Sequence, residues 1–153
     1  MQMNAAGYAL LKSFEQCRLT AYRDQGGVLT VGWGHVDSDV TPETKWTQEQ
    51  ADIAFALDVS RTVDELLDMI EPELTDNQFS ACVCLAYNIG SHAFYGSSAL
   101  DAINNGPLDD VPRCIERWNK VRIAGVLHIS RGLVRRRAAE VALWWQSIKG
   151  AFR

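Results

Sequence analysis

Residues 13–35 read SFEQCRLTAYRDQGGVLTVGWGH, and within this stretch a helical pattern gives way to the pattern of a tight hairpin. A helix is predicted over residues 4–15, with Asn4 as its cap and Leu10, Leu11 and Phe14 on an apolar face. Residues 19–24 and 28–33 are rich in strand-forming side chains and flank two glycines, which predicts an antiparallel hairpin.

Three polar side chains mark this helix-to-hairpin segment as a candidate site. Glu15 ends the predicted helix, Asp24 lies nine residues later at the hairpin tip, and Thr30 follows on the second strand. Hydrolysis of a glycosidic bond needs an acid for the leaving oxygen and a base for water, which two carboxylates can supply. Taken singly, each residue would be an ordinary surface, turn or strand residue, so the hypothesis depends on all three meeting.

The rest of the chain is predicted to be helical, which gives an α+β, predominantly helical fold class in a single domain over residues 1–153. Thr47 with Gln50, and Thr75 with Gln78, have the spacing of capping boxes that start two helices. The first should run over about 47–70 as a half-exposed connecting helix, and the second, apolar nearly all round, should end at Gly90. Shorter helices are expected near 97–104 and 108–119. We therefore expect a hairpin lobe at about 16–46 and a helical lobe at about 72–153 that includes the N-terminal helix, with a cleft between the lobes.

Charge is distributed unevenly along the chain. The net charge is −4, but residues 113–153 carry ten Lys or Arg against Glu116 and Glu140, which leaves five basic against seventeen acidic residues before them. The basic end suggests an anionic partner, and a solvated helical face explains it equally well.

The N-terminal residues predict neither a secretion signal nor a membrane anchor, because Lys12 and Glu15 interrupt the apolar run. The four cysteines, at positions 17, 82, 84 and 114, have no CxxC spacing, so we expect reduced and mostly buried thiols.

The segment from Phe14 to His35 resembles the catalytic signature of the phage-type lysozymes, glycoside hydrolase family 24. In that signature a Glu, eight residues, an Asp, five residues and a Thr precede a GxGH element, as at Glu15, Asp24, Thr30 and His35. Further matches follow in order: residues 74–90 with AFYGSSAL, RWNK at 117–120, and GLVRRRAAE at 132–140. The resemblance spans almost the whole chain and implies a lysozyme-like, two-lobed fold.

The resemblance implies a muramidase that cleaves the β-1,4 bond between N-acetylmuramic acid and N-acetylglucosamine in peptidoglycan. Glu15 would protonate the leaving oxygen, while Asp24 and Thr30 would hold the attacking water. The family is regarded as inverting, which predicts carboxyl groups separated by roughly 6.5 to 9.5 Å. We expect no cofactor and no metal, and His35 is predicted to be a structural histidine in a packed corner.

Substrate contacts are implied at Val36, Tyr87 and Ser97, the positions that match the family's cleft-lining residues. Tyr87 could equally belong to the core of its apolar helix, and Ser97 could simply cap the next helix. Trp33 and Val36 depart from a frequent Tyr and a frequent Thr, which puts the details of sugar binding in doubt.

Arg136 and Arg137 are each spaced to form a helix-face ion pair with Glu140. The family motif suggests in addition that one of these arginines orients the Glu15 carboxyl.

The last helix is predicted to place Val134, Ala138, Val141, Trp145 and Ile148 inward and Arg135, Arg136 and Lys149 outward. Its cationic and aromatic residues could contact an anionic outer membrane. The simpler interpretation is a core Trp145 with solvent-facing charges. The residues of this basic segment are Arg131, Arg135, Arg136, Arg137, Trp144, Trp145, Lys149, Phe152 and Arg153.

Other classes of function fit less well. A zinc amidase or peptidase needs ligand spacing that the histidines lack, and a nucleic-acid-binding module leaves the acidic residues before 113 unexplained. A lytic transglycosylase would not need Asp24 and Thr30, and a catalytically inactive wall-binding protein would retain every motif. The family match implies a monomeric endolysin of a phage or prophage. It would be made in the host cytoplasm, be released by a holin to act on the cell wall, and have no nucleic-acid partner.

Overall fold

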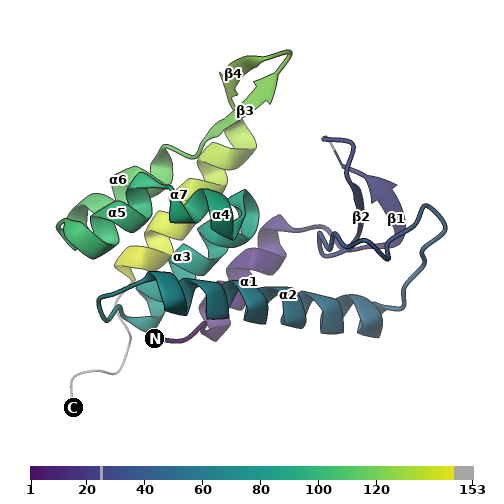
Figure 1. Cartoon of the computed structure of the whole chain (residues 1–153), viewed down its shortest axis with the longest axis horizontal. Helices are drawn as coiled ribbons and strands as arrows, with labels where there is room; N and C mark the ends of the chain where they lie inside the picture. Colours follow the sequence, from purple (N-terminus) through teal and green to yellow (C-terminus); the bar gives the residue numbers. More distant parts are fainter. Residues whose placement is uncertain (25, 147–153) are drawn as a thin grey trace. The chain divides into compact units, whose positions relative to one another are not determined.

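The computed structural model describes residues 1–24 and 26–146. The chain is mostly helical with two small antiparallel hairpins, which confirms the predicted fold class (Figure 1). Internal contacts divide it into two compact units, one formed by Met1–Leu10 with Thr62–Arg153 and the other by Leu11–Arg61. Among the described residues, no helix combines the length and apolar character needed to cross a bilayer.

The unit Leu11–Arg61 holds the hairpin predicted from the sequence. Strand β1 (Arg18–Arg23) pairs antiparallel with β2 (Leu29–Gly32), and Tyr22 lies opposite Thr30. The turn depends on Gly27, whose φ of 81° falls in the left-handed region that glycine adopts without strain. At the other end of β2, Gly32 has φ 64°, and a Cβ there would lie 3.1 Å from the Trp46 ring. The backbone at Gly32 therefore packs closely against Trp46 and leaves no room for a side chain.

Helix α2 (Gln48–Met69) starts at the predicted capping box, because Thr47 Oγ1 accepts from the Gln50 amide at 3.2 Å and Gln50 Oε1 accepts from the Thr47 amide at 2.8 Å. Its apolar stripe is buried, as expected of an amphipathic helix, while its opposite face is exposed. The buried stripe consists of Phe55, Val59, Leu66 and Ile70. The helix runs through the boundary of both units, which falls between Arg61 and Thr62.

The other unit is built around α3 (Asp76–Ile89), which has the predicted Thr75–Gln78 capping box and ends at Gly90. Its residues from Phe79 to Ala86 are all buried, so this helix forms the centre of the core, as its apolar sequence predicted. Helix α1 (Ala5–Phe14) is capped by Asn4, whose Oδ1 accepts from the Gly7 amide and whose Nδ2 donates to Asn77 Oδ1 on α3.

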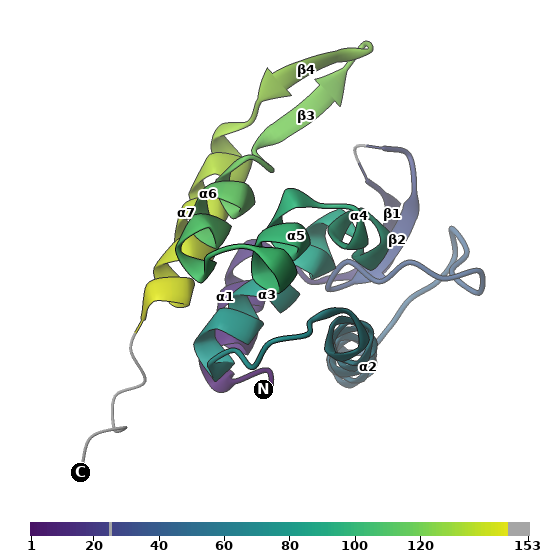
Figure 2. The same ribbon diagram turned by 60° about the vertical axis from the view of Figure 1, so that its left-hand side comes forward.

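The remaining helices of this unit pack on one another and on α3 (Figures 1 and 2). They are α4 (Ser91–Tyr95), α5 (Ser98–Asn105), a single 3₁₀ turn (Leu108–Asp110), α6 (Val111–Glu116) and α7 (Arg131–Trp145). Pro112 lies in the first turn of α6, where its missing N–H costs no helical hydrogen bond.

A second hairpin, which the sequence analysis did not predict, follows α6. Strands β3 (Lys120–Ile123) and β4 (Val126–Ile129) pair antiparallel across a turn at Ala124 and Gly125. Both turn residues have positive φ, 47° and 82°, as a type I′ turn requires. The signal was weak because alanine adopts this conformation poorly and Ala-Gly is not a typical hairpin pair.

Replacing Ala124 with Asn is therefore expected to stabilise the second hairpin by roughly 0.5–1 kcal/mol, since Asn tolerates the left-handed region and Asn-Gly favours this turn. The measurement is amide hydrogen exchange in β3 and β4, which reports local opening of the hairpin. Ala124→Val should accelerate exchange at the same amides, because a β-branched residue is strained at positive φ. Equal exchange rates in both variants would contradict the role assigned to the turn.

Candidate active site

The three residues of the predicted catalytic trio all lie in the unit Leu11–Arg61. Glu15 follows the last residue of α1, and its amide still donates to the Leu11 carbonyl at 3.0 Å, so it continues the helical hydrogen bonding. Its side chain is half-buried, whereas Asp24 is exposed at the end of β1 and Thr30 is buried on β2.

Backbone amides of the hairpin turn fix the position of the Asp24 carboxylate. Its Oδ1 accepts from the amides of Gly26 and Val28, both at 2.8 Å, and its own amide donates to the Val28 carbonyl. Two amide donors hold the carboxylate in one orientation. The Gly26 amide therefore serves the site, whereas Gly27 supplies the positive φ of the turn.

The Thr30 hydroxyl has its proton committed, because Oγ1 donates to the Val28 carbonyl at 3.0 Å. A hydroxyl that donates in this way keeps its lone pairs for accepting a hydrogen bond, for example from water. Thr30 pairs with Tyr22 in the ladder between β1 and β2, and Tyr22 precedes Asp24 by two residues. The same turn thus positions the Asp24 carboxylate and a hydroxyl oxygen, that of Thr30, which can accept a hydrogen bond from water.

Glu15 lies beside the GxGH element at the end of β2. A Cβ built on Gly34 would lie 3.5 Å from Glu15 Oε2, and Gly34 itself has φ 93°. Only glycine adopts this backbone conformation without strain. The second glycine of the element therefore places the backbone next to the candidate acid.

Gly34→Ala is expected to reduce activity, because the added methyl group comes into van der Waals contact with the Glu15 carboxyl while positive φ strains the backbone beside it. The matched control is Gly125→Ala in the second hairpin, where φ is 82° and no atom lies within 4 Å of the new Cβ. Both variants should lose roughly 1–3 kcal/mol of unfolding free energy from backbone strain, measured by denaturant titration. If the two variants lost activity equally, the contact with Glu15 would not explain the defect of Gly34→Ala.

His35 holds the loop that carries Gly34. Its Nδ1 lies 2.7 Å from Asp58 Oδ2, and its ring packs against Trp46 at a centroid distance of 5.1 Å with the ring planes tilted by 44°. Reciprocal backbone hydrogen bonds of 2.9 and 3.0 Å join His35 to Val31. These contacts agree with the predicted structural role of His35.

A second group of contacts beside the site was not predicted. Trp33 Nε1 donates to Asp52 Oδ1 at 2.7 Å, and the Lys12 ammonium lies 5.1 Å from the Trp33 ring centroid and 3.7 Å from Asp52 Oδ1. The hydrogen bond from Trp33 is the main reason that the pKa of Asp52 is lowered. The sequence signal was Trp33 in place of the family's frequent Tyr, which supplies an indole N–H where Tyr supplies a hydroxyl.

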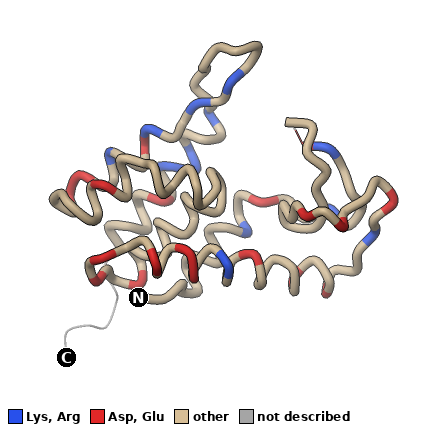
Figure 3. The backbone as a smooth tube through the Cα atoms, viewed as in Figure 1, with Lys and Arg blue, Asp and Glu red and all other residues tan. Residues whose placement is uncertain are grey.

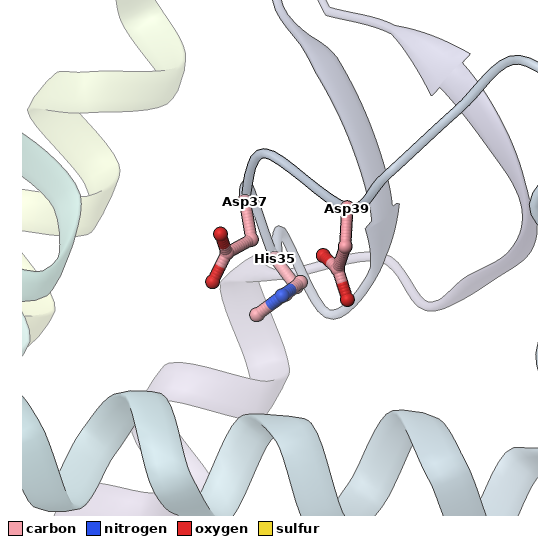
Figure 4. Close-up of side chains that lie close together, drawn as sticks. All are labelled: His35, Asp37 and Asp39. Atoms are coloured by element: carbon pink, nitrogen blue, oxygen red, sulfur yellow. The ribbon is translucent and has the colours of Figure 1, made fainter.

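The loop after β2 also gathers His35, Asp37 and Asp39, as Figure 4 shows. Their ligand-type atoms all lie within 4.8 Å of one another, although both aspartates are exposed. The Ser38 amide, which donates to Asp37 Oδ1 at 2.6 Å, is the main cause of the lowered pKa of Asp37. These local contacts account for the grouping, and the expected absence of a metal remains a prediction.

The predicted substrate contacts fall in different places. Val36, in the same unit as the trio, is 53% exposed. Tyr87, on α3, is half-buried, and Ser97 is buried where its Oγ caps α5 by accepting from the Leu100 amide at 3.2 Å. The alternative interpretation of Ser97 as a helix cap is therefore confirmed. A sugar-binding role for these three residues remains a prediction.

Arg136 and Arg137 are buried on α7 with Glu140. Arg136 Nε lies 3.3 Å from Glu140 Oε1, Arg137 Nε lies 3.2 Å from Oε2, and Arg137 Nη2 donates to Asn88 Oδ1 at 2.5 Å. Both predicted ion pairs are confirmed, but they are buried where a surface pair was expected. Burial raises the pKa of Glu140 to about 7, against the opposing effect of the two arginines.

The predicted orientation of α7 is wrong. Val134, Ala138 and Trp145 are exposed and Val141 is half-buried, while Arg136 is only 5% exposed. The buried face follows the helical spacing 136, 137, 140, 143 and 144, and both of its arginines pair with Glu140. The prediction placed the wrong face of α7 inward because it rested on hydrophobicity and assumed that charged residues face solvent. Trp144 is the buried tryptophan, and Ile148, Lys149, Phe152 and Arg153 lie outside the described residues.

All four cysteines are free thiols, as expected. Cys82 and Cys84 are buried, whereas Cys17 and Cys114 are half-buried. Burial raises the pKa of Cys82, which keeps it protonated and unreactive.

Comparisons with known proteins show which family the chain is similar to. The family model described as phage lysozyme matches residues 12–140. The chain is 40% identical over 146 residues to an endolysin of Bacillus phage PZA, with 94% of the chain and 55% of that protein covered. It is 34% identical to an endolysin of Acyrthosiphon pisum secondary endosymbiont phage 1, of which it covers 98%. The chain thus spans about half the length of the first relative and nearly all of the second.

Solved structures give the same result. The muramidase domain of SpmX from Asticaccaulis excentricus superimposes with a TM-score of 0.87 at 31% identity, covering 95% of this chain and 99% of that one. An endolysin from Escherichia coli O157:H7 phage FAHEc1 gives 0.85 at 33% identity, covering 97% and 96%. The expected lysozyme-like fold is confirmed, and the chain belongs to the phage lysozyme family.

Proposed function

We propose that the protein is a glycoside hydrolase that cleaves the β-1,4 bond between N-acetylmuramic acid and N-acetylglucosamine in peptidoglycan. The observation that carries the proposal is the turn at Asp24, where two backbone amides hold the carboxylate and a neighbouring carbonyl fixes the Thr30 proton. Family membership and the names endolysin and muramidase among its relatives support the same substrate.

In this mechanism Glu15 donates a proton to the glycosidic oxygen as the bond breaks. Asp24 accepts a proton from the attacking water, and Thr30 Oγ1 accepts a second hydrogen bond that orients the water. Because Asp24 would activate a water while Glu15 separately protonates the leaving group, the water would attack the anomeric carbon directly and invert its configuration. Val36, Tyr87 and Ser97 are proposed sugar contacts, and Arg136 or Arg137 a positioning residue for Glu15.

The decisive experiment is product analysis on purified peptidoglycan. New reducing ends support the proposal, whereas new amino groups indicate an amidase or peptidase and anhydro-muramic ends indicate a lytic transglycosylase. Binding to the polymer without any of these products would identify a catalytically inactive wall-binding protein. Proton NMR of the first anomer released tests inversion, and retention would assign Asp24 a different role.

We further propose that the enzyme acts as a monomer, without nucleic acid, on the wall of a bacterium in whose cytoplasm it is made. Release through a membrane lesion made by a holin is part of this proposal, which rests on the family resemblance. Expression alone should leave a host intact, and expression with a holin should lyse it. Lysis without the holin would exclude holin dependence while leaving the hydrolase proposal standing.

The basic C-terminal helix was also predicted to contact an anionic outer membrane. Its buried pair Arg136 and Arg137 cannot supply that contact, so within the described residues the proposal for this helix rests on Arg131, Arg135 and the exposed Trp145.

A further inference from the structure

The second hairpin exposes an unusual amount of aliphatic surface. Ile123, Val126, Leu127 and Ile129 are between 53% and 68% exposed, although such side chains are typically buried. Figures 1 and 2 both show β3 and β4 extending beyond α6 and α7, to which the hairpin is joined. A two-stranded hairpin standing alone in water is marginally stable, so this surface gains from contact with an apolar phase.

The strand register places apolar side chains on both faces of the hairpin. Ile123 lies opposite Val126 on one face, and Arg122 lies opposite Leu127 on the other. From Ile123 to Leu127 the tip carries no charged side chain. A surface for a single flat partner would have one apolar face, whereas a tip with aliphatic side chains on both faces is suited to shallow insertion, with the Arg122 guanidinium at the turn left to meet lipid headgroups.

The base of the hairpin is cationic. Residues 117–139 contain seven Lys or Arg and no Asp or Glu. Glu140 pairs with Arg136 and Arg137, and the base also carries the exposed Arg117, Lys120, Arg131 and Arg135. The Arg122 side chain instead reaches the turn, where it donates to the Gly125 carbonyl. Figure 3 shows this run of basic residues along the hairpin and the start of α7. Arg131, Val134 and Arg135 line an open hollow of about 420 Å³ directly after β4.

We propose that this hairpin is a membrane-docking element that inserts its aliphatic tip into the surface of a bilayer containing anionic phospholipid. An anionic bilayer matches this surface, because the cations at the base can contact lipid phosphates while Ile123, Val126 and Leu127 enter the boundary between headgroups and acyl chains. A purely anionic polymer would use the cations but leave the apolar tip in water. A second copy of the chain would bring like charges together.

The test uses the full chain and co-sedimentation with vesicles of phosphatidylcholine, alone or mixed with phosphatidylglycerol. Wild type should bind only the anionic vesicles, and binding should weaken as salt is raised. Val126→Ser with Leu127→Ser should weaken binding by roughly tenfold for each side chain withdrawn from the lipid. Arg131→Gln with Arg135→Gln should weaken it by about fivefold for each charge lost.

Matched controls make the same kinds of substitution outside the hairpin and its base. Leu57→Ser removes an aliphatic side chain that is 61% exposed on α2, and Arg113→Gln removes an exposed cation on α6; both should bind as wild type does. Every variant should retain hydrolysis of isolated peptidoglycan, so failure of this proposal is distinguishable from failure of the hydrolase proposal.

Equal binding of wild type to neutral and anionic vesicles, or to neither, would overturn the proposal. Heparin, an anionic polymer, is tested in parallel. If wild type and the double variant Val126→Ser with Leu127→Ser both bind heparin and neither binds anionic vesicles, the cations at the base of the hairpin bind a polyanion and not a membrane. Unchanged vesicle binding in the tip variant would also exclude insertion. The wild-type comparison of the two vesicle types remains decisive even if a hairpin variant is unstable.

Discussion

Replacing Glu15 with Gln is expected to slow the release of reducing ends from purified peptidoglycan by about 10²–10⁴-fold, the contribution typical of a general acid. Gln has the shape of Glu but cannot transfer a proton to the leaving oxygen. The measurement is the initial rate with a reducing-sugar assay on protein of verified folding.

The matched control is Glu43→Gln, which removes an exposed carboxylate from the same unit without touching the site. It should leave both rate and stability unchanged. Binding of Glu15→Gln to peptidoglycan should also persist, because the substitution removes proton transfer and keeps the shape of the site. A Glu15→Gln enzyme with a near-normal rate would exclude the proposed acid.

Replacing Arg137 with Met is expected to lower the free energy of unfolding by about 1–3 kcal/mol near pH 8, because Glu140 Oε2 loses its partner and only Arg136, at Oε1, stays paired with this carboxylate. Arg137 is 1% exposed and Glu140 is fully buried, so water cannot replace the lost contact. The Asn88 amide oxygen also loses its donor. Denaturant titration at fixed pH measures the change.

The pH dependence follows from the raised pKa of Glu140. A carboxyl with a pKa of about 7 in the folded protein and 4.5 as its ordinary value binds more protons when folded, so its contribution to stability falls as pH rises between these values. Arg137 opposes this rise, so its removal extends the loss to higher pH. The cost of Arg137→Met should therefore be smaller at pH 5 than at pH 8.

A charge-free triple variant is the control for this cluster. Combining Arg136→Met, Arg137→Met and Glu140→Leu removes every buried charge, and replacing such a cluster with apolar residues is often neutral or stabilising. The triple variant should recover most of the stability lost by Arg137→Met. If it regains stability but not activity, the proposed positioning of Glu15 by an arginine is supported; full activity would exclude it.

Much of the fold was predictable because local chemistry marks its boundaries. Thr47 and Thr75 begin their helices with side-chain hydrogen bonds that neighbouring residues supply, and Gly90 ends α3 at a φ of 89°. The first hairpin was equally clear from its two glycines. Such signals act within a few residues, so a sequence displays them directly.

Features that depend on partners distant in sequence were not predictable. Arg137 is buried because α3 supplies Asn88, and Trp33 meets Asp52 across nineteen residues. The Ala124 turn contradicts local preference and is held by strand pairing, with Arg122 donating to the Gly125 carbonyl. In each case tertiary contacts outweigh the preference of the single residue, which is the information that local patterns lack.

The capping boxes of α2 and α3 both use a glutamine, Gln50 and Gln78, where a glutamate is the common alternative. An amide does not titrate, so acidification leaves these reciprocal hydrogen bonds intact at the start of both helices. Acid sensitivity should then arise at carboxylates such as Asp52, whose lowered pKa gives a contribution to stability that is lost as pH falls. As pH falls below 3.8, the ordinary pKa of this carboxyl, we expect α2 and α3 to stay anchored at their N-termini while the contacts of Asp52 weaken.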